Sequence, residues 1–327
     1  GGFGFLRGRA RPATALICAF IDQYRDRFGV EPICRVLTEH GTPIAEATYW
    51  MRKKRGISGR EQRDQWLKGE IKRVHAANFG VCGARKIWIA LNREGIAAAR
   101  CTIERLMREL GLRGARRGGY KIPTTQSDPS HDRAPDRVDR AFTAARPHRL
   151  WVADFTEVAL SPGKRVYVAF VVDVYSRAIY GWAAATTKHT KLVLDAVDHA
   201  LWQRDRAAAP YGPDGEGLIH HSDAGSQYTS FRFTAHLAQA GLQASIGSVG
   251  DAYDNALMES TIGLYKTELI DRNPEWRNLT DVELATAEWI GWYNHQRLHS
   301  AIGYVTPADY EQQYWATATP AAPQVTT

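Results

Sequence analysis

A nearly unbroken run of Val, Tyr, Ala and Phe between Arg165 and Val174 constrains the fold of this chain more than any other feature. A strand that is apolar on both faces has to be covered on both faces, so it belongs in the middle of a sheet with helices packed against it. Turn residues at 161–164 separate this run from an earlier apolar segment. The sequence therefore predicts an α/β layer that begins near residue 150.

The rest of this region alternates strand-like and helix-like patterns. The predicted order is three strands, a helix, a strand, a helix, a strand and a helix, which indicates a mixed five-stranded sheet. The strands are expected at 150–160, 165–174, 178–185, 217–221 and 243–246, and the helices at 190–204, 230–240 and 255–270.

Three acids occupy positions in this layer where metal ligands are expected. Asp154 lies in the apolar strand "LWVADFTEV", where a carboxylate is unfavourable unless a partner or an ion compensates it. Asp223, in "IHHSDAGSQYTS", follows a short strand, and α/β folds place ligands at strand ends. Glu259, in "YDNALMES", lies on a helix, and 35 residues separate it from Asp223. Carboxylates on three rigid elements can converge on two divalent ions, and Mg²⁺ prefers oxygen ligands.

Each acid also has a simpler interpretation. Asp154 can be a structural ion pair or a cap at a sheet end, Asp223 a turn residue, and Glu259 a solvated helical side chain. Their order and placement together favour the catalytic and metal-binding interpretation of all three.

Several neighbours of the acids are candidates for further roles. Lys266 lies two helical turns after Glu259 on the same face, so it is expected to hold a DNA phosphate or base, with an exposed helical lysine as the alternative. Tyr228 can stack on a DNA base or pack in the core. We interpret His220 and His221 as structural and Asp173 as a strand-end cap.

The N-terminal half of the chain is basic and helical. Residues 1–150 hold 30 Lys and Arg against 15 Asp and Glu, whereas residues 151–327 hold 12 against 20. A basic half joined to an acidic half indicates a polyanion-binding module attached to a metal-binding module. The alternative is that the basic half only keeps the protein soluble.

Residues 61–121 have the pattern of a helix-turn-helix DNA-binding domain. A buried stripe at i, i+3, i+4 and i+7 runs from Ile103 to Leu110 and leaves polar and basic side chains outside. A three-helix packing domain with solvated arginines is the alternative. The DNA-contacting candidates in this domain are Arg100, Thr102, Arg105, Arg108, Arg113, Arg116, Arg117 and Lys121.

Changes in pattern divide the chain into five parts. Residues 1–60 are an N-terminal helical or helix-turn-helix segment, in which Thr42 and Pro43 are expected to begin a helix. The other parts are the helix-turn-helix domain at 61–121, a Pro-rich linker at 122–148, the catalytic core at 149–275, and a helical extension with a disordered tail at 276–327.

Two features argue against a zinc-binding cysteine cluster and against a membrane-spanning helix. The four cysteines form no CxxC pair and no Cys/His group with zinc spacing. No apolar run reaches the roughly 18 residues of a membrane span.

The motifs of residues 150–310 resemble a known family. The segments "WVADFTEV", "YVAFVVDVYSRAIYGW", "LIHHSDAGSQYTS", "GDAYDNALMESTIGLYKTE" and "YNHQRLHSAIGYVTPADY" are similar to the OrfB-type transposases of the bacterial IS-three insertion-sequence group. The resemblance implies an RNase H-like, retroviral-integrase-like core after an all-α region, with Asp154, Asp223 and Glu259 as the Asp-Asp-Glu triad and Lys266 as the basic residue after it.

The resemblance also implies an activity and its requirements. Such an enzyme hydrolyses a DNA strand at the terminal inverted repeat of its element, using two Mg²⁺ ions or Mn²⁺ in their place. The freed 3′-hydroxyl then attacks another phosphodiester. The expected partners are double-stranded end and target DNA, a second copy in a dimer or larger synaptic complex, and an upstream frameshift-related protein. The expected location is the bacterial cytoplasm, in association with the nucleoid.

Two rival functions remain open at this point. One is a DNA-binding regulator with an inactive core, and the other is an RNase H-type nuclease that cuts RNA–DNA hybrids. The basic helical half argues against the second. The absence of the His/His/Cys/Cys zinc module argues against the retroviral branch.

Overall fold

The computed structural model describes residues 12–55, 57–116, 138, 142–206, 217–223, 227–247, 256–273 and 275–318. The chain forms two compact units, residues 1–70 and residues 71–327. Within the described residues, no helix is long and apolar enough to cross a membrane.

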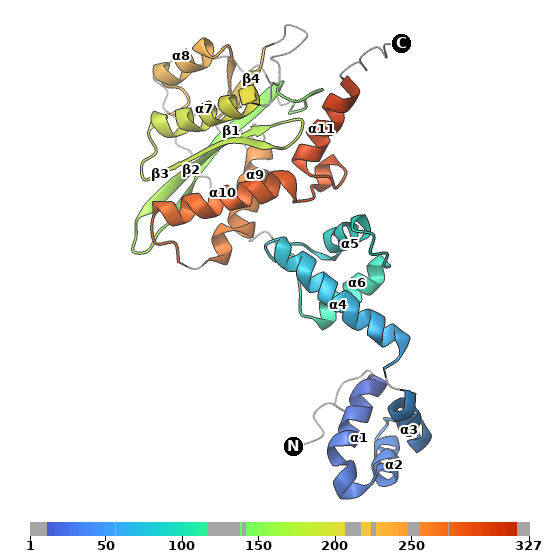
Figure 1. Cartoon of the computed structure of the whole chain (residues 1–327). Coiled ribbons are helices and arrows are strands. Elements are labelled where there is room, and N and C mark those ends of the chain that lie inside the picture. Colours follow the sequence, from blue (N-terminus) through green and yellow to red (C-terminus); the bar gives the residue numbers. More distant parts are fainter. Residues whose placement is uncertain are drawn as a thin grey trace, which may run out of the picture. The chain divides into compact units, whose positions relative to one another are not determined.

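The first unit contains three helices, α1 (Thr14–Phe28), α2 (Val30–Glu39) and α3 (Glu46–Arg55), around a small core (Figure 1). The expected start of α3 at Thr42 and Pro43 is wrong. The N–H of Thr42 bonds back to the carbonyl of Leu37 at 2.8 Å and Ile44 is buried, so residues 42–45 are an extended connection and α3 begins at Glu46.

Three further helices follow, α4 (Gly59–Ala77), α5 (Ala84–Arg93) and α6 (Arg100–Glu109). Ile103, Leu106 and Met107 are buried on α6, which confirms the predicted stripe, and α5 contributes Ile87 and Leu91. α5 and α6 are joined by a short turn in which Gly95 takes a φ of 80°, a conformation that glycine adopts without strain.

The second unit contains the predicted five-stranded mixed sheet, in the order β3-β2-β1-β4-β5. β1 pairs antiparallel with β2 and parallel with β4, and β4 pairs parallel with β5. The apolar run that begins at Arg165 forms β2, an interior strand. The strands are β1 (Leu150–Ala159), β2 (Arg165–Asp173), β3 (Ile179–Ala185), β4 (Ile219–Ser222) and β5 (Gln243–Ile246).

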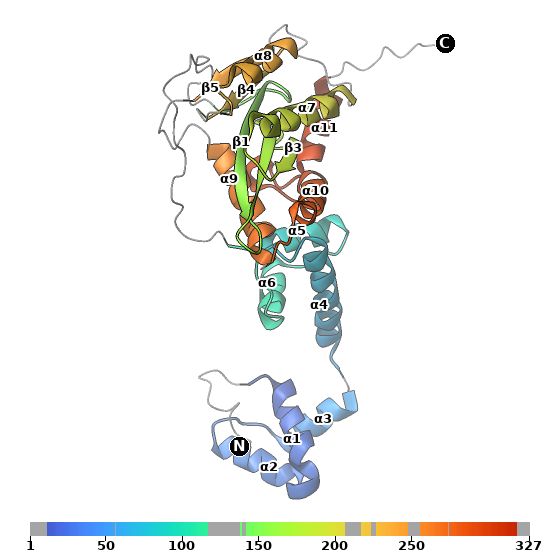
Figure 2. The same cartoon turned by 90° about the vertical axis from the view of Figure 1, so that its left-hand side faces the viewer.

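Helices cover both faces of the sheet. α7 (Thr190–Arg206) and α8 (Phe231–Gln239) pack on one face against Trp151, Ala153 and Val171. α9 (Ala256–Glu268) and α10 (Leu279–His295) pack on the other face, where Val152 and Phe170 belong to the same core (Figures 1 and 2). Residues 270–272 form a 3₁₀ turn between α9 and α10.

A helical extension completes the unit. α11 (Pro307–Ala318) has Thr306 as its N-cap, because the N–H of Asp309 donates to the Thr306 hydroxyl at 3.1 Å. Residues 319–327 lie outside the described residues.

The end of the predicted linker contacts the core of the second unit. Within 122–148, the described residues are 138 and 142–148, and Val138 belongs to the core. The ring of Phe142 lies 5.3 Å from that of His221, and Arg146 and His148 are buried.

Candidate active site

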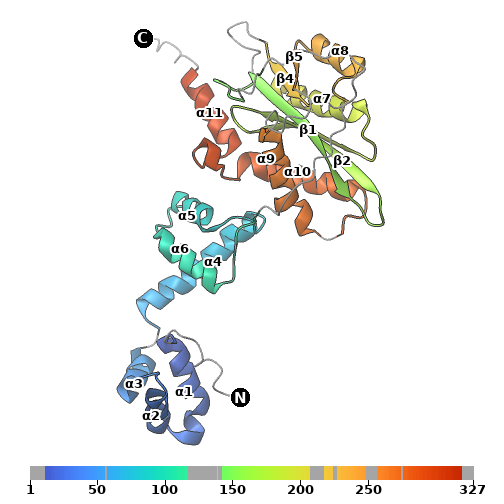
Figure 3. The same ribbon diagram turned by 180° about the vertical axis from the view of Figure 1, so that it is seen from behind.

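The strand register brings Asp154, in β1, and Asp223, directly after β4, to neighbouring positions. The parallel register of β1 and β4 ends with Ala153 opposite Ser222, so the next residues on the two strands are these two acids. β4 and β5 lie together at this edge of the sheet (Figure 3). The side chains of both aspartates are half-buried, and Oδ1 of Asp154 accepts a hydrogen bond from the N–H of Phe155 at 2.7 Å.

All three acids belong to one face of the sheet. Side chains alternate between faces along a strand, so Asp154 shares the face of Val152, which packs with α9 and α10. Asp223 shares the face of Ile219, which packs on the same core. Glu259 is in the first turn of α9, next to Met258 of that core, and its side chain is exposed.

The structure brings the two aspartates together but does not bring Glu259 into contact with them. Within the described residues, no three His, Cys, Asp or Glu side chains lie close enough together to hold one ion. Lys266 is half-buried further along α9, seven residues after Glu259.

Tyr228 is a buried residue of the core beneath α7 and α8. Its side chain is 1% exposed, and its ring lies between Phe155 and Phe233, at centroid distances of 6.4 and 5.4 Å. Burial, and then Asp154 and Asp223, raise the pKa of its hydroxyl well above 10. A ring enclosed in this way favours the packing alternative for Tyr228 over the predicted stacking on a DNA base.

The donors at this position fit a divalent cation. Two adjacent carboxylates are the oxygen ligands that Mg²⁺ prefers. The chemistry of Asp154 and Asp223 therefore suits such an ion.

The competing candidates near the site are structural. Asp173 is fully buried at the end of β2 and accepts hydrogen bonds from the backbone N–H of His148 at 2.9 Å and from the N–H and hydroxyl of Ser176 at 2.7 and 2.8 Å. It is therefore the strand-end cap that the sequence predicts, and burial raises its pKa.

Burial lowers the pKa of His220 to about 3, so this imidazole is neutral. His221 is buried and its Nδ1 lies 2.9 Å from the Ser245 hydroxyl.

The predicted DNA-contacting residues of α6 lie at the protein surface. Arg100 pairs with Glu104 at 3.0 Å and Arg105 with Glu109 at 2.8 Å, so two of the arginines are partly neutralised by their own helix. Thr102 is half-buried and Arg108 is exposed. Arg113 and Arg116 are exposed just after α6, whereas Arg117 and Lys121 lie outside the described residues.

A second buried acid lies at the other end of α9, and the sequence analysis missed it. Glu268 accepts two hydrogen bonds from Arg297, at 2.6 and 2.8 Å, and both side chains are buried. Arg297 also lies 3.2 Å from Nδ1 of His299, whose pKa is lowered to about 2, first by burial and then by Arg297. Burial and Arg297 also lower the pKa of Lys86 on α5. Glu268 and Arg297 are 29 positions apart, and the sequence carries no local signal that would have paired them.

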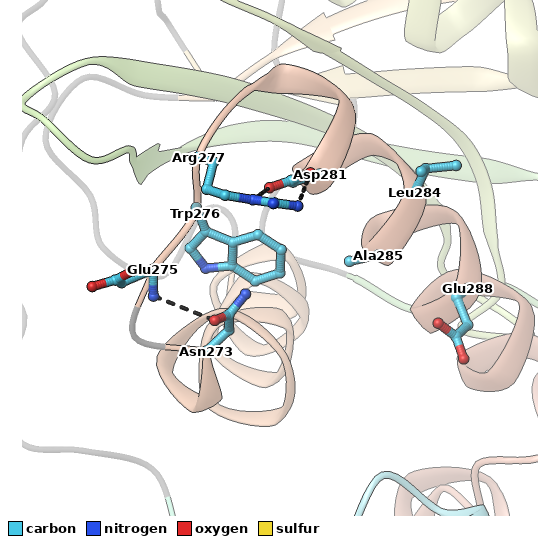
Figure 4. A pocket seen from close by; sticks show the side chains of 8 residues that line it. All are labelled: Asn273, Glu275, Trp276, Arg277, Asp281, Leu284, Ala285 and Glu288. Atoms are coloured by element: carbon cyan, nitrogen blue, oxygen red, sulfur yellow. Dashed lines mark hydrogen bonds and ion pairs between the residues drawn. The ribbon is translucent and has the colours of Figure 1, made fainter.

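A surface pocket lies at the connection from α9 to α10. Figure 4 shows its lining from Asn273 to Glu288, with Trp276 at its centre. Its polar groups bind one another: Arg277 pairs with Asp281 at 2.6 and 3.0 Å, and the N–H of Glu275 donates to Asn273 at 3.3 Å. None of the three predicted acids lines it, so we do not assign the chemistry to this pocket.

Comparison with known proteins identifies the domains. Residues 144–252 and 240–307 match family models described as integrase core domain, and residues 61–120 match one described as HTH-like domain. A protein of insertion sequence element IS986/IS6110 from Mycobacterium tuberculosis is 53% identical over 84% of this chain and 97% of its own length. The transposase for insertion sequence element IS629 from Shigella sonnei is 46% identical over 90% of this chain and 96% of its own length.

Among solved structures, the similarity is weaker. A simian T-cell lymphotropic virus intasome chain is 17% identical with a TM-score of 0.44, over 79% of this chain and 80% of that chain. The HTLV-2 integrase catalytic core domain in complex with magnesium is 16% identical with a TM-score of 0.40, over 52% of this chain and 99% of that chain. The family assignment rests on the sequence relatives and the domain models.

Proposed function

This chain belongs to the insertion-sequence transposases with an integrase core and an HTH-like domain, and from this premise we propose how it acts. It binds the terminal inverted repeats of its element, hydrolyses a DNA strand at each end, and joins the 3′-hydroxyl to a phosphodiester of target DNA. The observation that carries the proposal is the register of β1 and β4, which puts Asp154 next to Asp223.

We assign the catalytic and metal-binding roles to Asp154, Asp223 and Glu259. The two aspartates would hold Mg²⁺, or Mn²⁺ in its place, and Glu259 would join them from the first turn of α9 to complete a two-ion site. When bound, such ions align the attacking and leaving oxygens of a phosphoryl transfer and neutralise developing charge. Lys266, two turns along the same helix, would hold a phosphate of the DNA end.

We assign recognition of the element's ends to the HTH-like domain. α6 would lie in the major groove with Thr102, Arg105 and Arg108 toward the DNA, and Arg100, Arg113, Arg116, Arg117 and Lys121 would follow the phosphate backbone. Two ends have to be held together for transposition, so we propose a dimer or larger synaptic complex, with an upstream frameshift-related protein as a further partner.

The test is metal-dependent nicking of a labelled duplex that carries the terminal repeats, with wild type compared with Glu259→Gln. We expect nicking to fall by about 10³-fold or more, because a lost ligand removes several kcal/mol of charge stabilisation and each 1.4 kcal/mol is a factor of ten. Binding of the duplex should persist. Glu288→Gln, an exposed helical acid on α10, is the matched control and should nick like wild type.

Other outcomes would change the proposal. Nicking preserved in Glu259→Gln would remove this residue from the mechanism. Binding without nicking by wild type would favour either a regulator or a missing partner, and addition of the upstream protein would separate these two. Cleavage of an RNA–DNA hybrid without strand transfer would favour the RNase H-type nuclease.

A further inference from the structure

Phe79, just after α4, adopts a backbone conformation that favours glycine. Its φ is 54°, in the left-handed region. The N–H of Gly80 bonds back to the carbonyl of His75 at 2.9 Å and closes the last turn of the helix. A left-handed residue at the end of a helix is usually glycine, because a Cβ atom is crowded by the backbone there. A phenylalanine held in this strained conformation indicates that its side chain has a role that offsets the strain.

The ring of Phe79 packs on α10 of the catalytic core. Its centroid lies 5.0 Å from that of Trp292, a side chain that is 3% exposed. The indole N–H of Trp292 donates to the side-chain oxygen of Asn78 at 3.2 Å, and the Asn78 amide donates to the carbonyl of Val74 in α4 at 2.8 Å. Two successive residues at the end of α4 therefore hold the same tryptophan, one with its ring and the other with a hydrogen bond.

Further contacts join the following segment to the core and to the end of α6. The guanidinium of Arg85, at the start of α5, lies 4.7 Å from the ring centroid of Tyr304. Val81 belongs to the core that α9 and α10 cover, and its carbonyl accepts the N–H of Ala115, in the segment after α6, at 2.9 Å. All these residues belong to the second compact unit. The contacts of Asn78 and Phe79 with Trp292 therefore form a joint between the HTH-like domain and the catalytic core.

We propose that Asn78 and Phe79 are positioning residues, which fix the HTH-like domain on the catalytic core by binding Trp292. The joint thereby sets which phosphodiester of a bound DNA end reaches the three acids. The inference rests on the proposed function and deepens it. α10 packs on the same face of the sheet as α9, which carries Glu259, so an end held by α6 is presented at a fixed distance from the active site. Such placement matters, because a displacement of about 1 Å can lower a rate by about 10²-fold.

Phe79→Gly in the full chain tests the joint. The substitution removes the ring and relieves the left-handed backbone, so its two effects on stability have opposite signs, and urea unfolding verifies that the chain is folded. The duplex with the terminal repeats should bind with wild-type affinity, because no DNA-contacting candidate is altered. Nicking at the wild-type position should fall by about 10–100-fold. New nicks should appear at neighbouring phosphodiesters, which a sequencing gel resolves.

Two variants are controls. Phe79→Tyr keeps the ring and should nick at the wild-type position and rate. Phe28→Gly removes an exposed ring at the end of α1 and should do the same. A further readout needs no activity: hydrogen exchange of the Trp292 indole N–H, followed by NMR and assigned with Trp292→Phe. The indole should lose protection in Phe79→Gly, because the ring that packs on it is gone.

The outcomes separate the inference from the function on which it rests. Unchanged indole protection in Phe79→Gly, or nicking at the wild-type position and rate, would overturn the positioning role while the transposase proposal stands. If wild type failed to nick the end duplex while the indole lost protection in Phe79→Gly, the proposed function would fail and the joint between the two domains would stand.

Discussion

Two acidic regions of the second unit differ in the partners of their carboxylates: Glu268 at the end of α9, and Asp154 with Asp223 at the edge of β1 and β4. At the C-terminal end of α9, Glu268 is bound by both arms of the Arg297 guanidinium, and Arg297 in turn lies against His299. At the edge of β1 and β4, the strand register brings Asp154 and Asp223 to neighbouring positions, and both are half-buried. The first region matches its acid with a basic partner, whereas the second brings two acids together. Burial of an acid alone therefore does not indicate function.

Removing one partner of the Glu268–Arg297 pair should have the largest effect on stability. Arg297→Met leaves the Glu268 carboxylate buried without a counter-charge, and we expect the free energy of unfolding to fall by about 3–5 kcal/mol. Urea denaturation measures this. The double variant Glu268→Leu with Arg297→Met removes both charges and should recover most of the loss. If Arg297→Met were as stable as wild type, Arg297 would not stabilise the buried Glu268 carboxylate.

Acid should affect both regions through their histidines. The folded-state pKa is lowered from 6.5 to about 2 at His299 and to about 3 at His220, mainly by burial. The unfolded chain therefore binds protons that the folded chain does not, so stability is full above pH 6.5 and is lost as the pH falls toward these values. Each imidazole contributes a slope of about 1.4 kcal/mol per pH unit.

The variant His220→Leu isolates one of these two contributions. Its unfolding free energy, measured by urea denaturation from pH 6 to pH 4, should fall less steeply than that of wild type by about 1.4 kcal/mol per pH unit. His295→Gln, on the exposed side of α10, is the control and should keep the wild-type slope. Equal slopes in wild type and His220→Leu would show that His220 is protonated in the folded chain.

The smallest effect on stability is expected at the Asp154–Asp223 pair, where a substitution should stabilise the protein. Asp154→Asn keeps an oxygen that can accept the Phe155 N–H and removes one of two adjacent negative charges. Like charges opposite each other on neighbouring strands are destabilising, so in EDTA the variant should be more stable by about 0.2–1 kcal/mol. Thermal or urea unfolding in EDTA measures this change. A loss of several kcal/mol would place Asp154 with Glu268, as an acid that serves the fold.

The sequence predicted the catalytic layer well because its signals are local. The apolar run of β2 has to be buried on both faces, and the N-cap at Thr306 depends only on residues three positions apart. The placement of Asp154 and Asp223 also followed from the strand pattern, although their adjacency depends on the strand order, in which β1 lies between β2 and β4.

The remainder of the site depends on contacts between distant segments. Arg297 reads as an ordinary basic residue until the fold brings it to Glu268, and Tyr228 reads as an aromatic residue in a polar loop until Phe233 covers it. Phe142 and His148 lie in a Pro-rich stretch whose composition indicates a linker, but ring contacts with His221 and Trp151 and the bond from His148 to Asp173 attach them to the core. Periodicity carries no information about such contacts.

The pairing of Glu268 with Arg297 also predicts which truncating mutations inactivate a protein of this kind. The two residues join α9, which carries Glu259, to a segment encoded almost thirty codons later. A nonsense or frameshift mutation just before Arg297 would leave the codons for all three acids of the triad intact. The product would nevertheless bury the Glu268 carboxylate with no guanidinium beside it, at the far end of the helix that carries the third acid. Inactive copies of such an element should therefore include genes in which every catalytic codon is preserved and only the last few dozen codons are lost.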